Sequence, residues 1–415
     1  MTTRDQQGRE PALSAWAPPD PPIGCAIVGL GQRGASLARR LDALEGVDLR
    51  WFADLSSERM EAARERLSRA SPQFTDDAAR LLADPLVDAV FIAVPDHLHR
   101  TFAVAAFEAG KHVFLEKPLA TGLEDGLAIV GAWQDSGRVL QLGYVLREAP
   151  FYRAARRVIA EGRLGAIHAI RLTDDLGVVH GASFMRRWHR HSAVSGGLMV
   201  HKGCHDLDLI CWLLDSRPAR VASFGGAELF ARPAPAPFCS QCPERGFCPY
   251  VDTGAFEGRT PAQSADPTAF GLDICVFGGD KNIVDNQVVA FEMEGGARGS
   301  FALAMQNPHG SERTLSVLGR DGRLDGVFDR AVFEVATNDG APVRKWSPTR
   351  GALRGHGGGD EGTVRAFLEA CLGRAAPQLT DPDGALRGLV FALAAEVSRR
   401  RGVVVTLGDD LGGLR

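Results

Sequence analysis

A glycine-rich turn between a short apolar segment and a helical pattern constrains the fold of this chain most. Ile23–Val28 is a short apolar run of the kind found in buried parallel strands. The pattern G-x-G-x-x-G follows, and Ala35–Leu44 then carries apolar residues at helical spacing. Strand, glycine turn and helix in this order predict a dinucleotide-binding unit. We expect the turn to contact the cofactor through Gly29, Leu30, Gly31, Gln32, Arg33 and Gly34.

Each glycine of the turn has its own physical reason, and an acidic residue extends the pattern. Gly29 allows the tight turn, Gly31 lets the backbone approach a pyrophosphate, and Gly34 lets helix and strand pack closely. The helix N-terminus offers free N–H groups to the phosphates. Val47–Ala53 predicts the next strand, and Asp54 ends it. A carboxylate there accepts hydrogen bonds from an adenosine ribose and repels a 2′-phosphate, so NAD is favoured over NADP.

Strand and helix patterns alternate as far as Tyr144, which predicts a Rossmann doubly wound parallel sheet over residues 23–146. Further strands are expected at 87–94, 113–115 and 139–143. Ligands of such a sheet bind beyond the carboxyl ends of its strands. Five residues directly follow strands at that edge and are expected to bind the cofactor: Pro95, His97, His99, Glu116 and Lys117.

The second half of the chain predicts a C-terminal α/β domain with a largely antiparallel open sheet over residues 147–415. Its expected strands lie at 167–172, 221–224, 273–277, 288–293, 299–304 and 314–318. Its expected helices lie at 151–161, 201–214, 364–372 and 384–400.

Length and composition limit the class of protein. A chain of 415 residues suggests two or three domains, and 45% apolar with 24% charged residues is typical of soluble globular proteins. A net charge of −4 gives no reason to expect nucleic acid or a membrane surface as partner. Residues 1–22 are polar and proline-rich and predict a disordered tail without a secretory signal. We therefore expect a cytoplasmic protein.

Two segments carry candidate catalytic groups. Lys117 lies near the expected nicotinamide, where an amine can stabilise negative charge on a reacting oxygen or pass a proton; a surface lysine in a turn is the alternative. His201, His205 and Asp208 share one helical face, so a histidine supported by a carboxylate is a plausible general base. The alternatives are a metal site and polar residues exposed on the helix surface. The metal site is disfavoured because the glutamate of the H-E-x-x-H motif is missing.

Taken in order, these motifs make the chain resemble the Gfo/Idh/MocA oxidoreductase family. The resemblance runs from Ile23 to near the C-terminus. It implies a Rossmann domain, a second α/β domain whose open sheet often supports oligomers, and NAD(P)-dependent oxidoreduction at a ring hydroxyl of a sugar or cyclitol. Lys117 matches the catalytic lysine of the family and His205 its catalytic histidine.

One position departs from the family pattern. Members commonly carry an aspartate four residues before the catalytic histidine, whereas this chain has His201 followed by Lys202. These residues make protonation of the histidine harder than a carboxylate would. We therefore expect a different proton relay or a different substrate contact here.

Several residues are expected to contact the substrate. Phe184–His191 is rich in hydrogen-bond donors and aromatic surface, as in a sugar-binding loop, although a solvated arginine-rich loop is the alternative. His356 is a further candidate, while Asp360 is expected to cap a helix. The predicted substrate-binding residues are Lys117, Arg147, Trp188, His201, Lys202 and His205.

A cysteine cluster lies outside the predicted site. Cys239, Cys242 and Cys248 could hold structural zinc if a fourth ligand came from elsewhere, but we favour reduced thiols in a packed loop and assign no metal.

The leading hypothesis is an NAD-dependent dehydrogenase in which His205 removes a proton from a secondary ring hydroxyl and Lys117 stabilises the alkoxide. The alternative is an enzyme that holds NAD tightly and regenerates it during epimerisation, elimination or glycoside cleavage. A non-catalytic NAD sensor is the third possibility. The expected partners are a small sugar or cyclitol substrate and further copies of the chain, as a dimer or tetramer.

Overall fold

The N-terminal part of the chain forms the predicted parallel sheet. The computed structural model describes residues 16–251, 273–347, 354–374, 382–408 and 414. Six parallel strands run in the order β3-β2-β1-β4-β5-β6. They are β1 (Ile23–Val28), β2 (Val47–Ala53), β3 (Gln73–Thr75), β4 (Ala89–Ile92), β5 (His112–Leu115) and β6 (Leu140–Leu142). The helices between them are α1 (Gln32–Asp42), α2 (Ser57–Arg64), α3 (Ala78–Ala83), α4 (His99–Glu108) and α5 (Leu123–Ser136). The Rossmann prediction is confirmed.

A nine-stranded, mostly antiparallel sheet forms the second layer, as predicted. Its order is β14-β13-β12-β11-β7-β10-β9-β8-β15, and only the pair of β7 and β10 is parallel. The strands are β7 (Ile167–Gly177), β8 (Pro218–Gly226), β9 (Asn286–Met293), β10 (Arg298–Asn307), β11 (Glu312–Gly319), β12 (Gly322–Val327), β13 (Val332–Thr337), β14 (Arg344–Trp346) and β15 (Val405–Thr406).

One expected strand is wrong. Residues 273–277 form no strand, and only Ile274 makes an isolated bridge, to Phe238. The apolar side chains that suggested a strand, Val276 and Phe277, are instead buried where this segment folds against the loop before it. Strands β12, β13, β14 and β15 were not expected.

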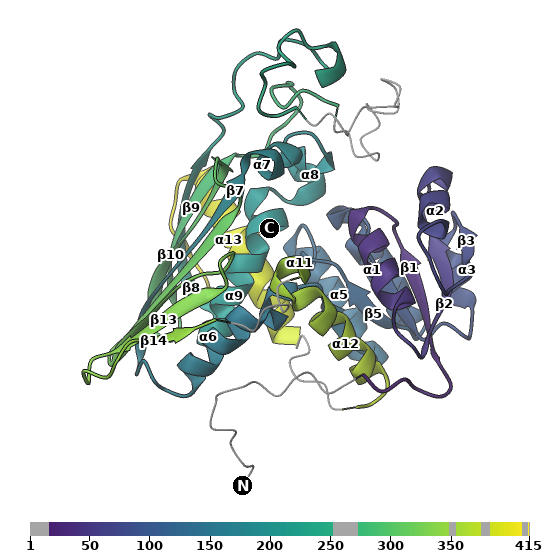
Figure 1. The fold of residues 1–415 in the computed structure, drawn as a ribbon, viewed down its shortest axis with the longest axis horizontal. Coiled ribbons are helices and arrows are strands. Elements are labelled where there is room, and N and C mark those ends of the chain that lie inside the picture. Colours follow the sequence, from purple (N-terminus) through teal and green to yellow (C-terminus); the bar gives the residue numbers. More distant parts are fainter. Residues whose placement is uncertain (1–15, 252–272, 348–353, 375–381, 409–413, 415) are drawn as a thin grey trace.

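Helices fill the space between the two sheets (Figure 1). These and the shorter helical turns of the second half are α6 (Pro150–Ala160), α7 (Val178–Phe184), α8 (Ser192–Ser195), η4 (Met199–Gly203), α9 (Cys204–Leu214), α11 (Arg354–Gly357), α12 (Gly359–Cys371) and α13 (Pro382–Arg401). Helix α13 packs against α9, and also against α5 of the Rossmann unit. Within the described residues, no helix is both long enough and apolar enough to cross a bilayer.

Helix α12 belongs to the second half of the chain but completes the core of the first. The fully buried Phe367 ring lies edge-on to Phe91 at 5.3 Å and to Phe114 at 5.7 Å, and Val364 and Leu368 join the same apolar cluster. In Figure 1 the yellow-green α12 lies beside the Rossmann strands. A division at residue 146 therefore separates the two sheets but not the two cores.

Candidate active site

The glycine turn has the geometry that a pyrophosphate requires. Gly29 has a φ of +90°, and a Cβ on Gly34 would lie 1.8 Å from the Gly29 carbonyl oxygen, so neither position accepts a side chain. A Cβ on Gly31 would meet nothing within 4 Å. Gly31 also begins α1 without a side-chain cap, which leaves the first N–H groups of the helix to a ligand. The residues present fit NAD.

Asp54 lies at the end of β2, beside the turn. Its Oδ2 accepts a hydrogen bond from the Leu30 N–H at 2.7 Å, and its Oδ1 accepts one from the Ser56 N–H at 2.9 Å. The carboxylate thus stabilises the turn, in addition to the ribose contact predicted for it.

Arg33 joins the turn to two other elements. Its guanidinium donates to Glu116 at 3.0 and 2.7 Å and to Asp360 of α12 at 2.9 Å. Asp360 also contacts the His356 Nδ1 at 2.9 Å. Burial opposes ionisation of Asp360, but the hydrogen bond from His356 and the charge of Arg33 hold its pKa below the usual range. Asp360 was expected to cap its helix; Gly358 occupies the cap, and Asp360 lies in the first turn.

In the loop after β4, His99 has a structural role, whereas Pro95 and His97 lie at the edge of the candidate site. His99 is fully buried, and its two ring nitrogens contact the carbonyl oxygens of Pro118 and Val94 at 2.8 and 3.3 Å. It therefore ties two loops together, and its contact with the cofactor stays a prediction. Pro95 is half-buried and His97 is exposed at the same edge.

Lys117 connects the Rossmann edge to the second half of the site. Its Nζ donates to the backbone oxygen of His201 at 2.8 Å. His201 lies in η4, a π-helical turn that leads into α9 and that the sequence pattern did not indicate. Such wide turns are frequent at functional sites.

The side chain of His201 has a carboxylate partner that spacing along the helix could not suggest. Its Nδ1 lies 2.5 Å from Oδ2 of Asp96, in the short helical turn η1 (Asp96–Leu98) after β4. The ring also lies 4.2 Å from the ring of His189 and 5.0 Å from that of Trp188.

His205 lacks the support that was expected from Asp208. Asp208 accepts two hydrogen bonds from Arg147, at 2.8 and 2.5 Å, and both residues are buried. The Nδ1 of His205 has no hydrogen-bond partner among the described residues. Burial, followed by the charges of Lys117 and Lys202, lowers the pKa of His205 well below its ordinary value. The imidazole is therefore neutral at neutral pH, and Arg147 holds Asp208.

Lys202 belongs to a buried ionic network. Its Nζ donates to Asp174, which also accepts from Arg313 at 2.8 Å, and Arg313 reaches Asp206 at 3.1 Å. Two cations and two carboxylates balance one another there. Lys202 was predicted to contact the substrate, but at least one hydrogen-bond donor of its ammonium group is already used within this network.

The loop predicted to bind substrate reaches the glycine turn. Arg187 donates to the side-chain oxygen of Gln32 at 2.9 Å, and Trp188 begins the turn η3 (Trp188–Arg190) next to His189 and His201. Arg190 forms an ion pair with Asp280 at 2.9 Å. Three segments far apart in sequence thus meet: the glycine turn, the loop after β5 and the loop around Trp188.

The cysteine loop lies outside this constellation. Cys239, Cys242 and Cys248 are free thiols, and burial is the main reason that the pKa of Cys239 rises to about 11. Within the described parts of the chain, no three His, Cys, Asp or Glu side chains are grouped closely enough to hold a metal ion.

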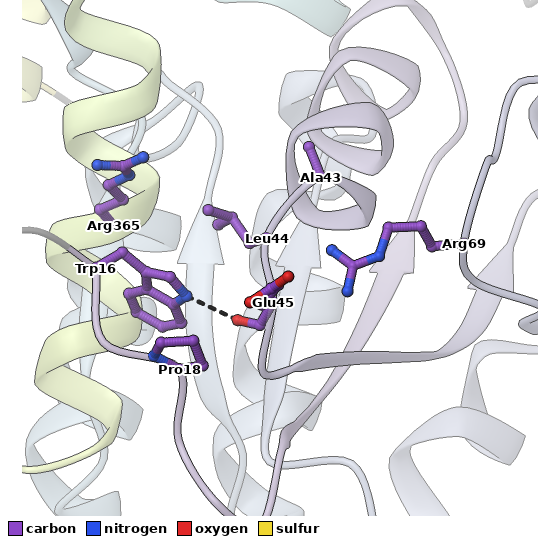
Figure 2. Close-up of a pocket in the computed structure, with 7 residues that line it drawn as sticks. All are labelled: Trp16, Pro18, Ala43, Leu44, Glu45, Arg69 and Arg365. Carbon is purple, nitrogen blue, oxygen red and sulfur yellow. Dashed lines mark hydrogen bonds between the residues drawn. The ribbon is translucent and has the colours of Figure 1, made fainter.

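A hollow of about 450 Å³ lies elsewhere on the molecule, and Figure 2 shows the residues that line it. Trp16 donates its indole N–H to the Glu45 backbone oxygen at 2.7 Å, Arg365 of α12 lies on the same side as Trp16, and Arg69 lies on the opposite side. The hollow lies near the C-terminal end of α1, whereas the glycine turn lies at its N-terminal end, so it is not part of the site.

Comparison with known proteins agrees with this geometry. A family model described as an oxidoreductase family with an NAD-binding Rossmann fold matches residues 23–144, and one described as a GFO/IDH/MocA C-terminal domain matches residues 152–325. The chain belongs to the Gfo/Idh/MocA oxidoreductase family. This confirms the resemblance inferred from the motifs and identifies an oxidoreductase.

Individual members of the family match over different lengths. The protein named "Putative oxidoreductase YteT" of Bacillus subtilis (strain 168) is 27% identical over 70% of this chain and 74% of its own length. The scyllo-inositol 2-dehydrogenase (NAD(+)) of the same organism is 31% identical over 49% of this chain, which spans little more than half (57%) of that enzyme. A levoglucosan dehydrogenase in complex with NADH and levoglucosan shares the fold, with a TM-score of 0.74 at 19% identity over 93% of this chain and 100% of its own.

Sequence reasoning missed three contacts of the site. Asp96, Arg187 and Asp360 contact His201, Gln32 and Arg33 respectively, each across more than a hundred residues. Asp96 follows a parallel strand and Arg187 lies in the donor-rich loop 184–191, so both carried a signal, whereas Asp360 was expected only to cap its helix.

Proposed function

We propose that the protein is an NAD-dependent oxidoreductase that transfers hydride between nicotinamide and a secondary ring hydroxyl or ketone of a sugar, glycoside or cyclitol. The contact of the Lys117 Nζ with the His201 carbonyl oxygen supports this most, because it joins the cofactor edge of the Rossmann sheet to the segment that carries His205. The relatives named above act, by their names, on inositol and levoglucosan.

Lys117 and His205 provide alkoxide stabilisation and proton transfer in this proposal. When bound, NAD supplies the nicotinamide that accepts hydride from the substrate carbon. The Lys117 ammonium stabilises the negative charge that grows on the substrate oxygen. His205 is neutral, so one of its ring nitrogens is available as an acceptor. Trp188 supplies an aromatic face for a sugar ring, and Arg147 acts indirectly by fixing Asp208.

NAD is proposed in preference to NADP because of Asp54. Its carboxylate lies at the end of β2 and would repel a 2′-phosphate. The charge of Arg59, 3.5 Å from Asp54, opposes this repulsion in part.

We also propose that the chain forms a homo-oligomer through the open face of the nine-stranded sheet. Phe224 on β8 and Val288 on β9 are directly paired, and they are 76% and 48% exposed. Two large apolar side chains side by side on a sheet face favour burial against a second copy.

The test is the absorbance of NADH during incubation of the purified protein with NAD and a panel of sugars, glycosides and cyclitols. A rise with one class supports net dehydrogenation. If mass spectrometry shows that a substrate is consumed without net formation of NADH, the alternative, an enzyme that regenerates its NAD in each cycle, would replace net dehydrogenation. If neither occurs across the panel, the substrate class is wrong.

A further inference from the structure

Asp96 and His201 form the shortest side-chain contact between the two halves of the site. They are 105 residues apart in sequence, and Oδ2 of Asp96 lies 2.5 Å from Nδ1 of His201. The two residues are only 3% and 8% exposed. A carboxylate and an imidazole buried together at hydrogen-bond distance act as one unit, because either alone would be left unpaired.

The surroundings place this pair between the cofactor loops and the loop around Trp188. Lys117 binds the backbone oxygen of His201 from one side. The rings of Phe184, Trp188 and His189 lie against the imidazole at 5.7, 5.0 and 4.2 Å. Aromatic packing of this kind restricts the rotation of the ring and orients its second nitrogen.

The chemistry of the pair differs from that of His205. When a neutral imidazole donates its Nδ1–H to a carboxylate, its Nε2 must be the acceptor, so the tautomer is fixed. His205 has no such partner at Nδ1, and Asp208, one turn away, is bound by Arg147. Of the two histidines, His201 is therefore the one prepared to accept a proton.

We propose that Asp96 and His201 are the acid–base pair of this enzyme, with Nε2 of His201 accepting the proton of the reacting hydroxyl and Asp96 as its positioning residue. The inference rests on the proposed function but assigns the proton transfer to His201 in place of His205. The substrate O–H bond breaks as the Nε2–H bond forms, and the hydride of the adjacent C–H bond passes to NAD as the carbonyl forms. The Asp96 carboxylate stabilises the imidazolium, while Lys117 and His205 contact the reacting oxygen.

Burial and the surrounding charges give the pair a defined pH dependence. Burial is the main cause that raises the pKa of Asp96 to about 7, and it also lowers the pKa of His201 well below its ordinary value. The charged and titratable groups that face the pair are His97, His99, Glu116, Lys117, His189 and Lys202. Since the ionised carboxylate accepts the Nδ1–H more strongly than the protonated acid and stabilises the imidazolium, oxidation should increase as the pH rises through the pKa of Asp96.

The first experiment does not depend on turnover. The nitrogen resonances of ¹⁵N-histidine in the full chain report which ring nitrogen carries the proton, and His201→Asn assigns the signal of His201. We expect the proton on Nδ1 above neutral pH, and a shift of the tautomer toward a proton on Nε2 in Asp96→Asn. A wild-type His201 protonated at Nε2 above neutral pH would overturn the proposal.

The second experiment follows kcat/KM against pH with the substrate found in the panel. Asp96→Asn and His201→Asn should each lower kcat by roughly 10²–10⁴-fold and remove the rise near neutral pH, with the affinity for NADH unchanged. His205→Asn should lower kcat but keep that rise. Asp42→Asn is the control, because it removes a buried carboxylate at the far end of α1 and should leave kcat within about threefold.

The outcomes separate the two proposals. If His205→Asn removes the pH inflection and His201→Asn keeps it, the pair is wrong but the oxidoreductase assignment stands. If no compound of the panel is oxidised, the proposed function is wrong, and the tautomer measurement still decides the pair. If Asp96→Asn does not fold, His201→Asn carries the kinetic test alone.

Discussion

Arg33 Nη1 lies 2.9 Å from Oδ1 of Asp360, a residue 327 positions later in the chain. Through this contact the glycine turn and the first turn of α12 hold each other in place, and Glu116 binds the same guanidinium at 2.7 Å. The position of the nucleotide-binding turn therefore depends on residues near the other end of the sequence.

Asp360→Asn should weaken NADH binding and lower the unfolding free energy by about 1–3 kcal/mol. This is less than the loss of a fully buried ion pair would cost, because the Arg33 side chain is 31% exposed to solvent. The depressed pKa of Asp360 stabilises the fold above its unfolded pKa of about 3.9, and this contribution is lost as the pH falls through the lower folded value. Thermal unfolding of variant and wild type should therefore converge in acid. Glu361→Gln, on the same helix but with a side chain 59% exposed, is the control.

Lys117→Met and His205→Asn should each reduce kcat by roughly 10²-fold or more, since each removes a group that contacts the reacting oxygen. NADH affinity, followed by fluorescence, should change little in His205→Asn. Full turnover in either variant on the true substrate would show that the residue has no role in the reaction.

Gly31→Ala and Gly34→Ala form a matched pair in the turn. The new methyl at Gly31 projects into open space, so the protein should fold normally but bind NADH more weakly. The methyl at Gly34 would clash with the backbone oxygen of Gly29, so that variant should unfold at a lower temperature. Normal NADH affinity in Gly31→Ala would contradict a pyrophosphate at this position.

Asp54→Asn should shift the preference from NAD toward NADP. The change removes the charge that repels a 2′-phosphate but retains an oxygen for the Leu30 N–H. The measurement is the ratio of kcat/KM for the two cofactors. Asp135→Asn, an exposed acid near the C-terminal end of α5, should leave that ratio unchanged.

Phe224→Glu should dissociate the proposed oligomer, because it introduces a charge on the open sheet face. Analytical ultracentrifugation measures the change in mass. Val343→Glu, at a side chain that is 59% exposed away from Phe224 and Val288, is the control. An unchanged mass for Phe224→Glu would exclude this face as the interface.

The Rossmann sheet could be predicted because its signals are local. Ile23–Val28, Val47–Ala53 and the glycines carry their structure in their own composition, and β1 and β2 have the predicted bounds. The second sheet was predicted only in outline. In β12 and β13, charged residues such as Asp325 and Glu334 alternate with the apolar ones, and the pairing of these strands gives them their structure.

Contacts between segments that are distant in sequence could not be predicted. The spacing of His201, His205 and Asp208 indicated that they share a helix face. It did not indicate that Asp208 would bind Arg147 or that His201 would contact Asp96. The fold determines such partners, because a carboxylate binds whichever donor lies nearest once the sheets are assembled.

The aromatic cluster of Phe91, Phe114 and Phe367 has a consequence for synthesis of the protein. The first two rings emerge early from the ribosome, but the third emerges only when most of the polypeptide has been made. Until then the nascent nucleotide-binding unit exposes an apolar surface where α12 will dock. The first domain to be translated is thus among the last to be finished.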